Sequence, residues 1–97
     1  MGIKVIVELR AQPGRRAELL GVLGEIVERE GAATPGFTGS TRYEVVGDPD
    51  VLVEIAEWES AEARMAHMEE SASSGAYAPL AEVLAEPPRA IVIRRLD

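Results

Sequence analysis

The chain of 97 residues contains no cysteine, which excludes disulfide bonds, thiolate catalysis and zinc sites built on cysteine. It has one histidine, His67, and no dense carboxylate cluster, so the sequence predicts no transition-metal site. The phosphate-binding patterns GxxxxGK[ST] and GxGxxG are missing, and no serine lies in a GxSxG elbow. We therefore expect a protein that works without a metal, haem or flavin cofactor.

Long apolar runs are missing as well. None approaches the roughly 18 residues that span a bilayer, and no charged-then-apolar leader precedes Ile3. The formal net charge of −7 argues against nucleic acid or an anionic membrane as a partner. With 46% hydrophobic and 28% charged residues, the composition is that of an ordinary globular protein. We expect a single cytoplasmic domain over residues 1–97.

The hydrophobic spacing predicts the order β-α-β-β-α-β, with an additional short helix before the last strand. Pro13 and Gly14 introduce the first helix, Gly31 ends it, and residues 47–50 turn a hairpin. This order is the ferredoxin-like α+β pattern, a four-stranded antiparallel sheet with helices on one face. The expected strands are residues 3–9, 37–46, 51–58 and 89–96, and the expected helices are about 13–31, 60–71 and 76–85.

Alternation along the strands predicts which side chains face the helices. The expected helix-facing set is Ile3, Val5, Val7, Val51, Val53, Ile55, Ile91 and Ile93. The expected uncovered set is Lys4, Ile6, Glu8, Leu52, Glu54, Ala56, Trp58, Val92 and Arg94. The uncovered face would then be half apolar, which favours a homodimer with a sheet-on-sheet core. The alternative is scattered apolar residues that have no partner.

Three residues stand out as candidates for chemistry. His67 flanks the predicted apolar stripe of its helix and is either a surface residue or a base at a pocket rim. Glu54 either pairs with Arg94 or Lys4, or is a pocket carboxylate with a raised pKa. Trp58 either packs in a dimer core or stacks on an aromatic ligand.

Other candidates depend on how the hairpin and the second helix are arranged. A simple register places Tyr43 opposite Glu54 and Arg42 on the other face, and a slip of one residue reverses this. The stripe of the helix over residues 60–71 is expected at Ala61, Met65, Met68 and Ala72. Met65 and Met68 are then either core residues or part of a ligand wall.

The chain resembles the antibiotic biosynthesis monooxygenase family over nearly its whole length. The resemblance lies in the order and spacing of the segments 35–40, Tyr43-Glu44, 57–63 and His67, together with Pro13-Gly14 before the first helix. It implies a dimeric α+β barrel. Some members of the family are cofactor-independent monooxygenases that use O₂ to convert aromatic polyketide phenols to quinones, whereas others degrade haem.

The departures from the family pattern narrow what the resemblance implies. The haem-degrading branch uses an Asn in the first strand, where this chain has Val7 and Glu8. It also uses a haem-ligating His after the helix break, where this chain has Tyr77. The quinone-forming branch has an Asn where this chain has Glu54. His67 and Glu54, as the plausible bases near Trp58, are the expected catalytic residues, acting on a small aromatic or hydrophobic molecule. The suggested substrate-binding residues are Trp58, Tyr43, Arg42, Met65, Met68 and Tyr77. A non-catalytic dimeric binding or structural module is the alternative.

Overall fold

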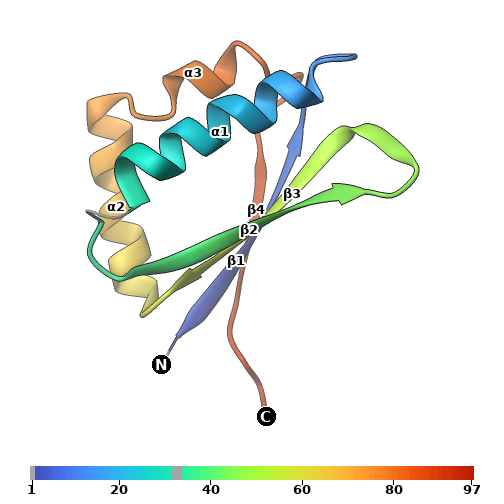
Figure 1. The fold of residues 1–97 in the computed structure, drawn as a ribbon. Coiled ribbons are helices and arrows are strands. Elements are labelled where there is room, and N and C mark those ends of the chain that lie inside the picture. The colour runs from blue at the N-terminus through green and yellow to red at the C-terminus, as the bar shows by residue number, and fades with distance from the viewer. Residues whose placement is uncertain (1, 32–33) are drawn as a thin grey trace.

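The computed structural model describes residues 2–31 and 34–97 and contains the predicted order of elements (Figure 1). The four strands form one antiparallel sheet in the order β2-β3-β1-β4, and the helices lie on one side of it. The ferredoxin-like α+β fold is therefore confirmed. The elements are β1 (Ile3–Arg10), α1 (Arg16–Gly31), β2 (Phe37–Val45), β3 (Asp48–Trp58), α2 (Ala61–Ser74), α3 (Ala78–Ala81) and β4 (Arg89–Ile93).

The hairpin between β2 and β3 is tighter than the sequence predicts. β3 begins at Asp48, so the turn consists of Val46 and Gly47 alone. Two-residue hairpin turns need a positive φ, and Gly47 supplies one of 94°. With so short a turn, the pairing of β2 with β3 continues to Val45 and Asp48, the residues on either side of it.

The second helix, α2, has strong signals at both ends. The Ser60 side chain accepts a hydrogen bond from the backbone N–H of Ala63, as the predicted cap requires. The helix continues past the predicted end at Ser71 as far as Ser74, and Gly75 ends it in the left-handed conformation. This extra turn brings Ser71 into the helix, where its side chain is buried.

The register of β1 with β3 corrects the predicted faces of the sheet. Neighbours across an antiparallel ladder share a face, and β1 pairs Ile3 with Trp58 and Val7 with Glu54. Because Ile3 is buried in the core beneath the helices, Trp58 and Glu54 face the helices too. The prediction for β3 was wrong because this strand is apolar on both faces, so alternation does not define its phase. The helix-facing residues of β3 are Leu52, Glu54, Ala56 and Trp58.

The last strand, β4, is corrected in the same way. Val92 pairs with Val5 and lies on the helix side, whereas Ile91 pairs with Ile6 and lies on the uncovered side. The uncovered face is thus partly apolar, as predicted, but most of its apolar residues are not the predicted ones. Its apolar members are Ile6, Tyr43, Val53, Ile55, Ile91 and Ile93.

The core fills the layer between the helices and the sheet in two clusters. In α1, Leu19, Leu23 and Ile26 are buried, as the helical stripe predicts, whereas Leu20 is 45% exposed beside the β2 edge. The larger cluster comprises Leu9, Ala11, Leu19, Leu23, Ile26, Leu52, Leu80 and Val83. The smaller cluster, at the other end of the sheet, comprises Ile3, Val5, Ala56 and Trp58.

Gly36 allows β2 to approach α2 closely, and its replacement tests this packing. It has a φ of 83°, and a Cβ atom there would lie 2.5 Å from the Cβ of Ala63. We expect Gly36→Ala to lower the free energy of unfolding by about 2–5 kcal/mol, from backbone strain plus overpacking. Gly47→Ala is the matched control, because Gly47 has a positive φ with open space around it. Denaturant unfolding that shows equal losses for the two variants would contradict the close approach.

Candidate active site

A cavity of about 80 Å³ lies in the helix–sheet layer, beside the smaller core cluster. Its apolar walls come from both layers, with valines of β1 on one side and α1 residues such as Leu23 on the other. Its polar residues come from α1, β3, α2 and the loops beside them. They are Glu30, Thr34, Glu54, Arg64, His67 and Tyr77.

Trp58 forms one aromatic wall of this cavity. It is the last residue of β3 and is only 5% exposed. Its ring lies edge-on to Phe37, with centroids 5.2 Å apart, and tilted against His67, with centroids 5.3 Å apart. Trp58 therefore belongs to the helix–sheet layer of its own subunit and not to the uncovered face.

His67 reaches the cavity from α2 and is held by two hydroxyl groups. Its Nε2 lies 2.9 Å from the Tyr77 hydroxyl and 3.3 Å from the Oγ of Ser71. The Tyr77 ring stands nearly perpendicular to the imidazole, with centroids 6.0 Å apart. The two hydroxyls fix the orientation of the ring, and the tautomer decides which group donates each hydrogen bond.

Glu54 brings a carboxylate into this mostly apolar layer. Its side chain is 13% exposed, and its Oε2 lies 4.0 Å from Nη1 of Arg42. Within residues 2–31 and 34–97, Oε2 is buried and has no hydrogen-bond partner. Burial raises the pKa of Glu54 above its usual value, and the charge of Arg42 and the Ser40 hydroxyl oppose this rise. The partner of Glu54 is therefore Arg42 and neither Lys4 nor Arg94.

Tyr77 follows α2 and closes the cavity next to His67. Burial raises the pKa of its hydroxyl, a hydrogen bond from Ser71 opposes the rise, and the negative charge of Glu54 adds to it. The two acidic groups therefore sense each other's charge across the cavity. At neutral pH the Tyr77 hydroxyl keeps its proton and can donate it.

The structure brings together most of the residues singled out from the sequence. Glu54, Trp58, His67, Met68 and Tyr77 all line the cavity. In β2 the register is the alternative one, since Arg42 is opposite Glu54 and shares the helix-facing side, while Tyr43 is on the uncovered side.

Met65 is the exception on α2. It is 64% exposed and does not line the cavity, and Ala72 is exposed too, so the predicted apolar stripe of this helix was right for Ala61 and Met68 only. The face of α2 that contacts the sheet is the one bearing His67 and Met68. Alanine is small and only weakly hydrophobic, so the alanines of α2 do not define which side of the helix is buried. The contact of His67 with Trp58 lies on the buried side.

Sequence reasoning missed Ser71 and Phe37 as parts of the site. Ser71 was treated only as the predicted end of this helix, yet it lies four positions after His67, the spacing that places two side chains on one face of a helix. That spacing could have identified it. Phe37 pairs with Trp58 across the β2–β3 ladder, which only the register reveals.

The comparisons with known proteins agree with this fold. Residues 2–78 match the model of the family described as antibiotic biosynthesis monooxygenase. The chain belongs to this family. No curated protein sequence matches the chain.

Solved structures of the antibiotic biosynthesis monooxygenase fold superimpose on nearly the whole chain. A Bordetella bronchiseptica protein that carries the family name is 21% identical, with a TM-score of 0.84 over 98% of this chain and 97% of that one. Rv0793 from Mycobacterium tuberculosis is 24% identical, with a TM-score of 0.79 over 100% and 97% of the two chains. An alanine-for-asparagine mutant of SnoaB, a cofactor-independent oxygenase from Streptomyces nogalater, is 16% identical, with a TM-score of 0.82 over 99% and 94%. At these identities the likeness shows the fold.

The described part of the chain holds neither a cluster of metal-ligating side chains nor a helix that could span a membrane. No three His, Cys, Asp or Glu side chains among the described residues gather so as to hold a metal ion. None of the helices in residues 2–31 and 34–97 is long and apolar enough to cross a membrane.

The raised pKa of Glu54 predicts the sign of a pH effect on stability. A carboxyl group whose pKa is higher in the folded state favours folding when it is protonated, and this contribution is lost as the pH rises from the usual value of 4.5 through the folded pKa. We therefore expect Glu54→Gln to increase the free energy of unfolding at pH 7 relative to the unmodified protein, and to change it less at pH 4. Glu44→Gln, at an exposed position of β2, is the control. Denaturant unfolding at both pH values measures the difference, and a larger gain at pH 4 would contradict the assignment.

Proposed function

We propose that this protein is a cofactor-independent monooxygenase that oxidises a small phenolic compound with O₂. The observation that carries the proposal is the cavity in which a buried carboxyl group, Glu54, lies in one layer with Trp58 and His67. The aromatic wall suits a flat substrate ring, and the carboxylate and imidazole are candidate bases.

The proposed reaction balances without an external reductant. The phenol loses its hydroxyl proton and one ring hydrogen, and it supplies the four electrons that reduce O₂. One oxygen atom enters the ring as a quinone carbonyl, and the other leaves as water. The step that needs assistance is removal of the hydroxyl proton, because a phenolate gives an electron to O₂ far more readily than a phenol does.

Glu54 is suited to this proton transfer. General-base catalysis is most efficient when the pKa of the base approaches the working pH, and burial moves the pKa of Glu54 in that direction. Its Oε2 is not engaged by any hydrogen bond within the described residues, so it can accept a proton from a bound ligand. His67, whose ring lies against Trp58, is the second candidate base.

A non-catalytic module that binds a small hydrophobic molecule is the competing function. The small size of the cavity favours it, since typical ligand pockets measure roughly 300–1,000 Å³ and this one measures about 80 Å³. The burial of Glu54 favours the enzyme, because a binding site for apolar molecules gains nothing from a carboxylate. Oxygen uptake distinguishes the two functions.

We further propose a homodimer formed through the uncovered face of the sheet. Proteins of this fold are commonly dimeric. The face carries the exposed residues Tyr43, Ile91 and Ile93 beside Ile6, Val53 and Ile55. A contiguous apolar patch of this kind is typical of an interface, and a two-fold axis would pair the patch with itself.

Replacing the bases tests catalysis. General-base assistance is usually worth about 10²–10⁴-fold in rate, so we expect Glu54→Gln or His67→Ala to lower kcat at least about tenfold while the dimer survives. Trp58→Phe should raise KM more than it lowers kcat, since the role proposed for Trp58 is stacking. The assay is oxygen uptake with anthrone- or naphthol-type phenols, with and without a metal chelator. Unchanged activity in both base variants would reject the assignment, and no turnover of any phenol would favour the binding module.

Charge on the uncovered face tests the dimer. We expect Ile91→Lys to shift the protein towards the monomer at micromolar concentration, because the substitution places a cation in the apolar interface. Val92→Lys is the matched control, since Val92 is the next residue, is similarly exposed and lies on the other face of β4. Light scattering reads the mass of each variant. A monomer for the unmodified protein, or equal effects of the two lysines, would contradict this interface.

A further inference from the structure

The cavity beside Trp58 accommodates only a small part of a typical ligand. At about 80 Å³ it is several times smaller than the pockets that enclose drug-sized molecules, so any larger substrate must extend out of it. Two of the hollows near the cavity differ in how they are connected to it: the first shares lining residues with it, and the second is linked to it only through the contact of Arg42 with Glu54. The first is a recess of about 250 Å³ on the α2 side, which shares Glu30, Thr34 and His67 with the cavity. The second is a groove of about 730 Å³ under the β2–β3 hairpin.

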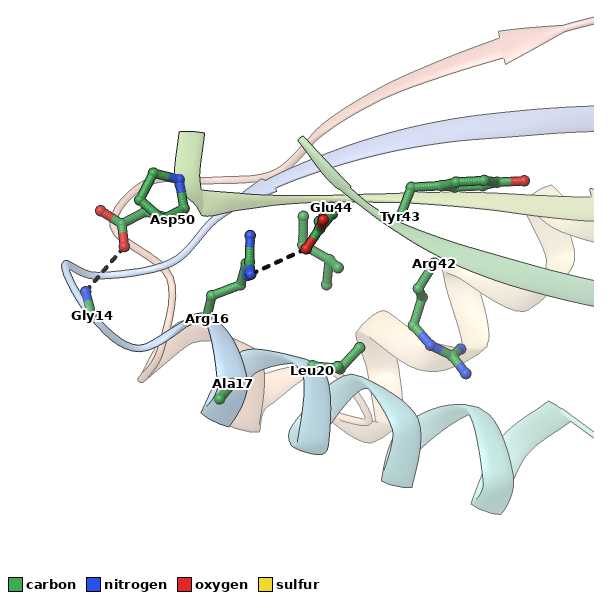
Figure 2. A pocket seen from close by; sticks show the side chains of 10 residues that line it. Gly14, Arg16, Ala17, Leu20, Arg42, Tyr43, Glu44 and Asp50 are labelled. Atoms are coloured by element: carbon green, nitrogen blue, oxygen red, sulfur yellow. Dashed lines mark hydrogen bonds and ion pairs between the residues drawn. The ribbon is translucent and has the colours of Figure 1, made fainter. Parts of the chain in front are cut away.

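The groove lies where α1 leaves the edge of the sheet uncovered (Figure 2). The exposed Leu20 of α1 forms part of its apolar floor, and Arg42 projects from β2 towards α1. Arg42 is also the residue that connects the two spaces. It lines the groove, and its guanidinium lies 4.0 Å from Glu54, which lines the cavity.

Arg16 and Asp50, two other charged groups in the groove, each have a hydrogen-bonding partner within the chain. Arg16 lies 3.5 Å from the carboxylate of Glu44, and Asp50 accepts a hydrogen bond of 3.0 Å from the N–H of Gly14 (Figure 2). Each of these groups is therefore compensated from within the chain.

The charge and the N–H donors of the Arg42 guanidinium are less well matched by neighbouring groups. Within residues 2–31 and 34–97, its guanidinium makes one long hydrogen bond, 3.4 Å from Nη1 to the Oγ of Ser40, and one ion pair of 4.0 Å with Glu54. A guanidinium has five N–H donors in a planar fork that matches a carboxylate. Its side chain is only 30% exposed, so solvent does not fully replace the missing partners. Arg42 therefore has unused donors aimed at a space large enough for a ligand.

The recess on the α2 side has the opposite character. Its charged residues are Glu30 and Glu70, and no Arg or Lys is among the described residues that line it. An anionic group is repelled there and attracted at Arg42. Between these two hollows, the charges therefore favour the groove for an anionic group.

We propose that the substrate is an aromatic compound with an anionic arm, such as a carboxylate, and that this arm lies in the groove on the guanidinium of Arg42 while the ring lies beside Trp58. The inference rests on the proposed function in placing the ring in the cavity. Arg42 acts as the residue that determines specificity for the charged arm. The cavity residues, and not Arg42, carry out the proposed oxidation of the ring.

Binding of two matched probes tests the inference without requiring turnover. The probes are 3-(4-hydroxyphenyl)propanoate and its neutral amide, and the fluorescence of Trp58, the only tryptophan, reports their binding. We expect the carboxylate to bind at least about tenfold more tightly than the amide, as charge-assisted hydrogen bonds allow. Arg42→Gln should abolish this preference and leave amide binding within about threefold. Glu54→Gln should strengthen binding of the carboxylate, because it removes the competing negative charge.

Arg16→Gln and Arg64→Gln are the controls, since Arg16 lines the groove and Arg64 lines the cavity. Both should keep the preference for the carboxylate. A preference that survives Arg42→Gln, or that either control abolishes, overturns the assignment to Arg42 and leaves the proposed oxidation untouched. Failure of both probes to bind overturns the inference together with the placement of the ring. Oxygen uptake without any preference for acidic phenols overturns the inference alone.

Discussion

The ladder between β1 and β3 determines what the helix–sheet layer contains. Because side chains alternate along a strand, the pairing of Ile3 with Trp58 also sends Glu54 towards the helices and leaves Val53 and Ile55 on the bare face. Both faces of β3 are apolar enough to be buried, so hydrophobicity alone does not select this register. The packing of Trp58 between Phe37 and His67 favours the observed register over the alternative one. The cavity, the ion pair with Arg42 and the composition of the uncovered face all follow from this one alignment.

The same alignment buries a carboxylate, which opposes folding at neutral pH. An ion pair at 4.0 Å offsets only part of the lost hydration, and the rest shows as the raised pKa of Glu54. A valine or leucine at this position would continue the apolar pattern of β3 without that cost. Residues that break the local hydrophobic pattern at a cost in stability, as Glu54 does, are concentrated at functional sites. The energetic penalty at Glu54 is therefore the strongest physical reason to regard the layer as a site and not only as a core.

The sequence predicts the order of elements well, because Pro13, Gly31 and Gly47 mark boundaries and the period changes from two to about 3.6 between them. The faces of β3 and α2 could not be predicted in the same way. β3 is apolar at consecutive positions, and α2 is rich in alanine. In neither element does the spacing of apolar residues show which face is buried. Trp58 and His67 were identified from their rarity and from the family resemblance, and Glu54 from its place on a mostly apolar face. Their meeting in one cavity depends on tertiary packing. Arg42 could not be placed at all until the hairpin register was known.

The hydrogen bonds around His67 suggest an order of proton transfers in the proposed reaction. Both Tyr77 and Ser71 contact Nε2 of His67, whereas Oε2 of Glu54 is open, so Glu54 is the group that can take the phenolic proton first. The negative charge of Glu54 contributes to the raised pKa of Tyr77. Once Glu54 is protonated, that contribution disappears, and the Tyr77 hydroxyl becomes a better donor when the reduced oxygen needs a proton. His67 then holds Tyr77 in place and can replace the proton it gives up. One buried carboxyl group thereby couples removal of a proton from the substrate to delivery of a proton to oxygen.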